Sequence, residues 1–406
     1  MANEAFRSLT IKYWPVNEHL VFPESDMLKD KADVGISLSG GGVRAAVVAV
    51  GWLQVLHELK VLHKVKYISS ISGGSWTSAP MSNCESDMDT FLAKIVPPEE
   101  CSIQKMNEFA TATNSHVKAL TEVQFSSQLL GNYLRKIPQS IATTVMHYLG
   151  CMQTIDEDYW SHTVGKCFFQ FHGIDHFSGL LHRPNIPYPI VNGSIIVGGK
   201  RGAIPVEFTP LYHGTPVSHD DIDAVYVEPK GFKAVIEKSA ASLTPSANPL
   251  QGSTITVQVI NDVQPLTCNE ISGISSAAIA EMLGGVSNVA YDLLNFPEHQ
   301  YFTNGVKKFN DGGTTDCTGT LALIRRNVTK IIACLACNDA ITSPTITDAN
   351  ASCYGTLAGL FGTQNSSSDI DRVSNEDYNK FRQVFEREKW DELIAALKEK
   401  DLQGIK

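Results

Sequence analysis

The stretch that decides the fold is VKYISSISGGSW, residues 65–76, in which a short β-branched run ends at Gly73 and Gly74. β-Branched and aromatic residues favour a strand, and two consecutive glycines permit a tight turn after it. The small residues that follow, SWTSAPMS, are typical of a closely packed helix start. We therefore predict a strand, a sharp turn and a helix, with Ser72 on the turn.

The same order of elements occurs about thirty residues earlier in the chain. Residues 33–38, DVGISL, form a short apolar run, three glycines follow at 40–42, and residues 43–59 have the length of a buried helix. After residue 252 the strand-like runs STITVQVI and VTKIIACLA flank a small-residue helix. Strands that alternate with helices indicate an α/β fold with a central, mostly parallel sheet and helices on its faces.

The domain organisation predicted from this pattern is one domain, residues 1–406, with an inserted cap. The core comprises residues 33–84 and 250–345, and the Pro- and Gly-rich stretch between them, 85–249, is the cap. A polar linker precedes a C-terminal helical extension at 370–406, whose apolar residues share one helix face.

Composition excludes several classes of function. The formal charge is −10, from 33 basic and 43 acidic residues, which argues against nucleic acid as a partner. No secretory leader and no run of about 18 apolar residues is found, so we expect a cytoplasmic protein with only peripheral membrane contact. Cys334 and Cys337 form a CxxC without a second ligand pair, which favours buried thiols over zinc or redox use.

Ser72 is the candidate nucleophile. A reactive serine stands on a sharp strand-to-helix turn with small neighbours, which give a substrate carbonyl room to approach. The usual Gly-x-Ser-x-Gly pattern occurs here with Ser70 in place of the first glycine, so a purely structural turn is the alternative. Ser70 and Ser75 are expected to hydrogen-bond the nearby backbone.

The glycine turn at residues 40–42 is the candidate oxyanion site, because N–H groups at a helix N-terminus point at a bound anion. A nucleotide-phosphate loop is the alternative, but a Walker motif needs Lys-Ser/Thr where Val43 and Arg44 stand. Asp311, followed by two glycines, is the candidate base at the sheet edge. An Asp before glycines is also a common turn.

Histidine decides between a dyad and a triad. The order Ser, Asp, His of the α/β-hydrolases needs a histidine after the acid, and none follows His299. A triad of Ser72, Asp262 and His299 remains the alternative to a dyad of Ser72 and Asp311.

Together the three turns resemble the cytosolic phospholipase A2 and patatin-like family, and especially its cytosolic phospholipase branch. The matching residues are SGGGVRA at 39–45, ISGGSW around Ser72, and Asp311-Gly312-Gly313, in the family's order and spacing. Weaker similarity extends over most of residues 33–340 but not over about 85–180. The unusual TTDCTG after Gly313 departs from the pattern.

The resemblance implies a Ser-Asp dyad without histidine, metal or cofactor. Ser72 would be the nucleophile, Asp311 the base, Gly41 and Gly42 the oxyanion donors, and Arg44 a cation for the substrate phosphate. The alternative for Arg44 is a salt bridge that holds the helix start. A calcium-dependent membrane-targeting module before residue 33 is not expected.

The function expected from this resemblance is a lipid acyl hydrolase of the phospholipase A2 or lysophospholipase kind, acting on phospholipid or another lipid ester through an acyl-enzyme. Its expected partners are the lipid substrate and a transient membrane or micelle surface. An acyltransferase on the same dyad and a non-catalytic lipid-binding protein of the same fold are the alternatives.

Overall fold

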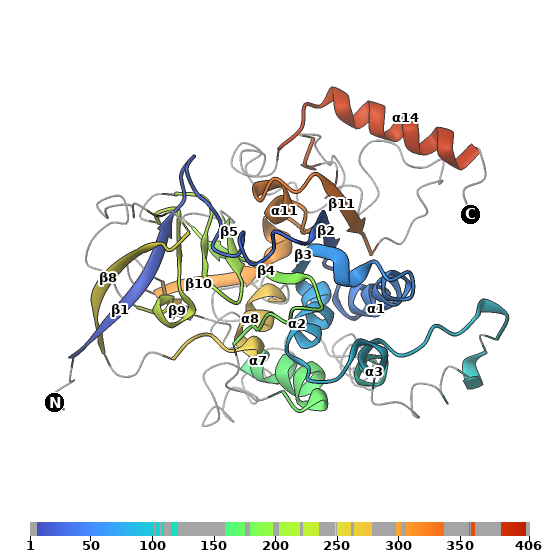
Figure 1. Ribbon diagram of the computed structural model, residues 1–406, viewed down its shortest axis with the longest axis horizontal. Coiled ribbons are helices and arrows are strands. Elements are labelled where there is room, and N and C mark those ends of the chain that lie inside the picture. The colour runs from blue at the N-terminus through green and yellow to red at the C-terminus, as the bar shows by residue number, and fades with distance from the viewer. Residues whose placement is uncertain are drawn as a thin grey trace, which may run out of the picture.

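The computed structural model shows an α/β protein built on one large sheet with helices on both sides (Figure 1). The structure describes residues 6–100, 102–105, 108, 115–120, 159–174, 179–197, 203–219, 222–234, 248, 250–260, 264–277, 298–301, 306–336, 357, 359–361 and 383–402. The predicted fold class, a central sheet flanked by helices, is confirmed.

Eleven strands of the described residues form the sheet in the order β11-β2-β3-β4-β5-β6-β7-β1-β8, with β10 on β4 and β9 on β10. Their bounds are β1 Phe6–Pro15, β2 Ala32–Leu38, β3 Val65–Ile71, β4 Tyr188–Ile196, β5 Ala203–Phe208, β6 His213–Thr215, β7 Val225–Val227, β8 Ser253–Ile260, β9 Glu298–Gln300, β10 Val306–Asp311 and β11 Lys330–Cys334.

The sheet is mixed rather than mostly parallel. Only the ladders β11-β2, β2-β3 and β3-β4 are parallel, while every other described ladder is antiparallel. The parallel part coincides with the strand–glycine–helix units, because parallel strands need a crossover connection. Antiparallel strands can be joined by a short turn without a helix. The alternation of strands and helices in the sequence therefore did not predict them.

The described helices cover both faces of the parallel part. In α1, Ala46, Ala49 and Leu53 pack into the main core with residues of β2 and β3. In α11, Ala322 and Leu323 pack on the other face against Tyr67 and Tyr188. The helices are α1 Gly42–Glu58, α2 Ser75–Asn83, α3 Met88–Leu92, α7 Tyr159–Val164, α8 Cys268–Ser275, α11 Leu321–Arg325 and α14 Glu388–Leu402.

Residues 188–227, assigned from sequence to the cap, contribute β4 to β7 to the sheet itself. The segment is rich in Pro and Gly, yet every residue of β4 except the last, Ile196, is buried, and β4 pairs in parallel register with β3. The rest of the proposed cap contributes α3 and α7 among its described parts.

Strand β1 lies outside the predicted core and pairs with β7 and β8. Its alternation is the signal that sequence reasoning missed: Ile11 and Tyr13 are buried, whereas Thr10 and Lys12 are exposed. Pro15 ends the strand, as a residue without an N–H donor would.

The C-terminal helix α14 begins at Glu388, well inside the predicted extension. Its Trp390 is buried against Leu321 of α11, together with Leu360 and Phe361. The helix therefore docks on the core, on the α11 side of the sheet (Figure 1).

Candidate active site

Ser72 stands on a strained turn between β3 and α2. Ile71 is still extended, with φ −137° and ψ 141°, whereas Ser72 has φ 49°, in the left-handed region. A non-glycine residue in that region costs roughly 1–3 kcal/mol and persists only where its surroundings hold it. The strain sits at the residue that sequence reasoning chose as the nucleophile, whose exposed fraction is 7%.

Hydrogen bonds to three serines hold this turn. The Ser72 N–H donates to Ser275 Oγ over 2.9 Å, and that hydroxyl donates to the Asn192 carbonyl over 2.7 Å. Ser75 Oγ donates to the Ser72 carbonyl over 2.6 Å. Ser70 Oγ lies 3.4 Å from the Ile190 carbonyl and donates to it, so Ser70 and Ser75 bond the backbone as expected.

Ser275, on α8, is a residue that sequence reasoning missed. Its side chain is fully buried and links the turn of Ser72 to β4. The only sequence signal was the small-residue run ISGISS, which indicates a closely packed helix but not the hydrogen-bond partners of its serines.

The glycine turn lies directly against the turn of Ser72. A Cβ on Gly73 would lie 1.9 Å from the Gly42 carbonyl oxygen, and one on Gly40 would lie 3.3 Å from Ser72 Cβ. Gly41 and Gly42 have φ of 135° and 64°, which favour glycine. Only glycine backbone allows this approach.

The N–H groups of the glycine turn differ in their partners. The Gly40 N–H donates to the Cys317 carbonyl over 3.0 Å, so it is already used within the protein. Gly41 and Gly42 lie at the first turn of the 17-residue helix α1, where N–H groups and the helix dipole favour an anion.

Asp311 is the last residue of β10 and is buried, with an exposed fraction of 5%. It pairs with Gly193 of β4, while Ile71, the last residue of β3, pairs with the adjacent Asn192. Because β5 occupies the other edge of β4, β3 and β10 meet end to end along a single edge. The chain therefore brings the turns after Ile71 and after Asp311 together.

The acid turn packs closely on this meeting point. Asp311 Oδ1 accepts the Gly313 N–H over 2.6 Å, which fixes the carboxylate against its own turn. A Cβ on Gly312 would lie 2.4 Å from the Asn192 carbonyl oxygen and 3.2 Å from Ile71 Cγ2. The three glycine-containing turns predicted from sequence thus form a single locus.

Arg44 is exposed in the first turn of α1, next to the glycine turn. Its role as a cation that binds the substrate phosphate stays a prediction.

The triad alternative gains no support from the described residues. His299 of β9 pairs with Lys307, four residues before Asp311 on β10. At about 3.3 Å per residue, its backbone lies about 13 Å along the strand from Asp311. Asp262, the acid of that alternative, lies outside the described residues.

A buried histidine, His116, and a partly buried one, His172, lie in contact with each other. His116 Nδ1 is 2.9 Å from His172 Nε2, and both rings pack on Phe91. Burial lowers the pKa of His172 to about 4, and burial with the neighbouring His172 lowers the pKa of His116 well below its usual value. Among the described residues, no cluster of three or more His, Cys, Asp or Glu side chains could hold a metal ion.

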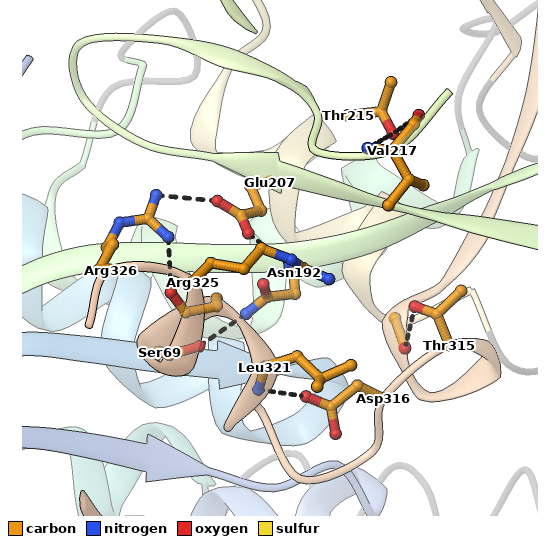
Figure 2. A network of polar contacts seen from close by, with 12 residues as sticks. Ser69, Asn192, Glu207, Thr215, Val217, Thr315, Asp316, Leu321, Arg325 and Arg326 are labelled. Carbon is orange, nitrogen blue, oxygen red and sulfur yellow. Dashed lines mark hydrogen bonds and ion pairs between the residues drawn. The ribbon is translucent and has the colours of Figure 1, made fainter. Parts of the chain in front are cut away.

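A buried polar network supports β4 next to the locus (Figure 2). Asn192 Nδ2 donates to Ser69 Oγ over 2.9 Å and to the Ser70 carbonyl over 3.0 Å. Opposite Asn192 on β5, Glu207 accepts from Arg325 and Arg326 over 2.7 and 2.8 Å. Burial alone would raise the pKa of Glu207, but the two arginines lower it.

Short segments of the chain are similar to phospholipases. One segment of 50 residues, 12% of this chain, is 38% identical to "Putative meiotic phospholipase SPO1" of Saccharomyces cerevisiae, of which it covers 8%. Another comparison, over 57 residues or 14% of this chain, gives 42% identity to cytosolic phospholipase A2 delta of Mus musculus, of which it covers 7%. The matches thus span less than a tenth of either relative.

Solved structures of human GIVD cytosolic phospholipase A2 are among the structures similar to this chain. One covers 62% of this chain and 28% of its own, with 16% identity and a TM-score of 0.31. A second, in complex with methyl gamma-linolenyl fluorophosphonate and terbium chloride, covers 71% and 37%, with 17% identity and a TM-score of 0.29. The chain matched no model of a known protein family.

Among the described residues, no helix is both long and apolar enough to cross a lipid bilayer.

Proposed function

We propose that this protein is a lipid acyl hydrolase of phospholipase type that uses Ser72 and Asp311 as a dyad. The observation that carries the proposal is the strained backbone of Ser72, φ 49°, at the point where the glycine turn and the turn after Asp311 meet. Similarity of short segments to phospholipases supports a lipid ester as the substrate class.

The proposed reaction has two acyl-transfer steps. Ser72 Oγ attacks the ester carbonyl while its proton passes to the Asp311 carboxylate, and the Gly41 and Gly42 N–H groups stabilise the oxyanion. The intermediate collapses, and the departing alcohol takes the proton from Asp311. Water then attacks the acyl-enzyme while its proton passes to Asp311, and Asp311 returns that proton to the departing Ser72 Oγ, which releases the fatty acid and restores the Ser72 hydroxyl.

The decisive test combines a serine probe with a lipid assay. Wild type, Ser72→Ala, Asp311→Asn and the control Ser82→Ala are treated with an alkyl fluorophosphonate and with a mixed lipid extract followed by mass spectrometry. Ser82 is a buried serine of α2 whose hydroxyl donates to the Ser78 carbonyl. Ser82→Ala therefore removes a buried hydroxyl close to the site without removing a proposed catalytic group.

The expected result is labelling and lipid hydrolysis by wild type and Ser82→Ala. Ser72→Ala should lose label, and both dyad variants should lose roughly a thousandfold or more in turnover while remaining folded. A folded Ser72→Ala with unchanged turnover would overturn the proposal. An unlabelled wild type that binds lipid vesicles would instead indicate the non-catalytic alternative.

Arg44 is proposed to bind the substrate phosphate. Arg44→Lys keeps the charge but loses the planar two-pronged geometry, so turnover of a phospholipid should fall more than turnover of a neutral ester. An equal fall on both substrates would indicate a structural salt bridge. Transient contact with a membrane or micelle surface belongs to the same proposal.

A further inference from the structure

The loop from Gly312 to Thr320 follows the proposed base and is ordered by one buried carboxylate, that of Asp316, with an exposed fraction of 7%. Oδ1 accepts the Thr318 N–H over 2.9 Å and the Thr318 hydroxyl over 2.6 Å. Oδ2 accepts the Leu321 N–H over 3.0 Å at the start of α11 (Figure 2). The loop therefore closes around this side chain.

The backbone of Asp316 ties the same loop to the acid turn. The N–H groups of Thr315 and Asp316 both donate to the Gly312 carbonyl, over 3.1 and 3.0 Å. Gly312 follows Asp311 directly. One residue thus connects the acid turn at one end of the loop with α11 at the other.

The next residue, Cys317, connects this loop to the glycine turn. Its carbonyl accepts the Gly40 N–H over 3.0 Å. Its Sγ lies 3.0 Å from where a Cβ of Gly40 would stand and 3.5 Å from that of Gly313. The glycine turn is therefore hydrogen-bonded, through the Cys317 carbonyl, to the loop that the Asp316 side chain holds closed.

We propose that Asp316 is a positioning residue for the glycine turn. By holding the loop closed, it keeps the Cys317 carbonyl on the Gly40 N–H and so fixes Gly41 and Gly42 relative to Ser72 and Asp311. The expected effect of Asp316 on turnover rests on the proposed function, whereas its effect on the position of the glycine turn does not. Donors misplaced by a fraction of an ångström lose much of their effect on a developing oxyanion.

Asp33 provides a matched control at the opposite end of the sheet. Its Oδ2 accepts the Thr329 N–H over 3.2 Å and the Thr329 hydroxyl over 2.6 Å, the same pair of bonds that Asp316 Oδ1 receives. These bonds link the loop after α11 to the start of β2, far along the strand from the glycine turn. Asp33→Ala therefore loses this pair of bonds at an exposed position, whereas Asp316→Ala loses the same pair and the bond from Leu321 at a buried one.

The experiment compares full-length wild type, Asp316→Ala and Asp33→Ala at a temperature where all three are folded. Hydrogen exchange is followed by mass spectrometry on peptides covering residues 37–45. Active sites are counted with the fluorophosphonate, and kcat per titrated site and KM are measured on a phospholipid. Thr318→Val, which removes the hydroxyl bond to Asp316 and the two bonds of the same hydroxyl with Thr320, is the variant to use if Asp316→Ala does not fold.

Asp316→Ala should speed exchange in residues 37–45 at least tenfold and lower kcat per site at least tenfold with KM nearly unchanged. Asp33→Ala should change neither quantity more than twofold. Thr318→Val should move both in the direction of Asp316→Ala. Loss of stability alone would reduce the number of active sites but not kcat per site.

Unchanged exchange in a folded Asp316→Ala, or unchanged kcat per site, overturns the positioning role while the proposed function stands. A wild type that neither labels nor hydrolyses lipid overturns the proposed function and the effect on turnover with it. The exchange measurement still decides, in that case, whether Asp316 holds the glycine turn.

Discussion

Two neighbouring serines show how much one hydroxyl can matter. Ser275 and Ser276 are both buried on or at the end of α8, and each bonds a side chain or backbone group of another segment. Ser275 Oγ accepts the Ser72 N–H, whereas Ser276 Oγ accepts from Trp160 Nε1 over 3.2 Å. Only the first reaches the strained turn.

Ser275→Ala and Ser276→Ala should each lower the free energy of unfolding by about 1–3 kcal/mol, because Ser275→Ala removes the acceptor of the buried Ser72 N–H and Ser276→Ala removes the donor to the buried Ser272 carbonyl. Only Ser275→Ala should slow fluorophosphonate labelling of Ser72, at least tenfold, since the left-handed backbone of Ser72 then lacks its support. Denaturant unfolding and labelling kinetics measure the two effects. Equal labelling rates would show that Ser275 does not position the nucleophile.

At the scale of elements, the close approach of α1 and the turn after β3 depends on Gly73. Gly73→Ala places a methyl group on the Gly42 carbonyl, so the two turns must separate. We expect a loss of several kcal/mol in the free energy of unfolding, with loss of labelling. Gly51→Ala, in the middle of α1 where a Cβ meets nothing within 4 Å, should stabilise by about 0.5–1 kcal/mol. Thermal unfolding of both variants tests this contrast, and an unaffected Gly73→Ala would contradict it.

Sequence reasoning succeeded where an element is defined by its own residues. Strands β2 and β3 and helices α1 and α2 were predicted because an apolar run, glycines and a small-residue helix follow one another locally. Strands β4 to β7 pair with one another as neighbouring antiparallel strands, and they were assigned to a cap because β4 joins the core through its parallel pairing with β3, which lies far earlier in the chain. The roles of Ser275 and Asp316 were missed for the same reason, since a hydrogen-bond partner is not visible in composition or period.

For the whole molecule, the buried group around Arg326 links the segment before β2 to the sheet and to the end of α11. Arg326 donates to Glu24 over 3.1 Å and to Glu207 over 2.8 Å, and all three side chains are fully buried. Arg326→Met should cost about 3–5 kcal/mol in the free energy of unfolding, because the buried Glu24 loses its ion-pair partner and the buried Glu207 is left with the partly exposed Arg325. Arg325→Met should cost less, since Arg325 is partly exposed and Glu207 keeps Arg326. Urea denaturation of both variants measures the difference, and equal losses would contradict it.

Stability of the whole protein should also depend on pH through a buried histidine. Burial lowers the pKa of His213 to about 4, below the ordinary value of 6.5. Between these values the unfolded chain binds the proton that the folded chain rejects, so stability falls as pH decreases from about 6.5 towards 4. The contribution of His213 is about 3 kcal/mol.

His213→Gln should therefore show a weaker loss of stability between pH 7 and pH 4.5 than wild type. His19→Gln, at an exposed position, is the control and should follow the wild-type slope. Denaturant midpoints measured at several pH values give the slopes. A His213→Gln slope equal to that of wild type would show that His213 does not contribute to the pH dependence of stability.

The end-to-end meeting of β3 and β10 on β4 also sets the order in which the protein acquires its chemistry during synthesis. The ribosome completes Ser72 and its turn first, and Asp311 emerges more than two hundred residues later, an interval of about 10–50 s at ordinary elongation rates. Under the proposed mechanism, a nascent chain therefore carries the nucleophile without its base. Under the same mechanism, the nascent chain hydrolyses no lipid until β10, which carries Asp311, has paired with β4.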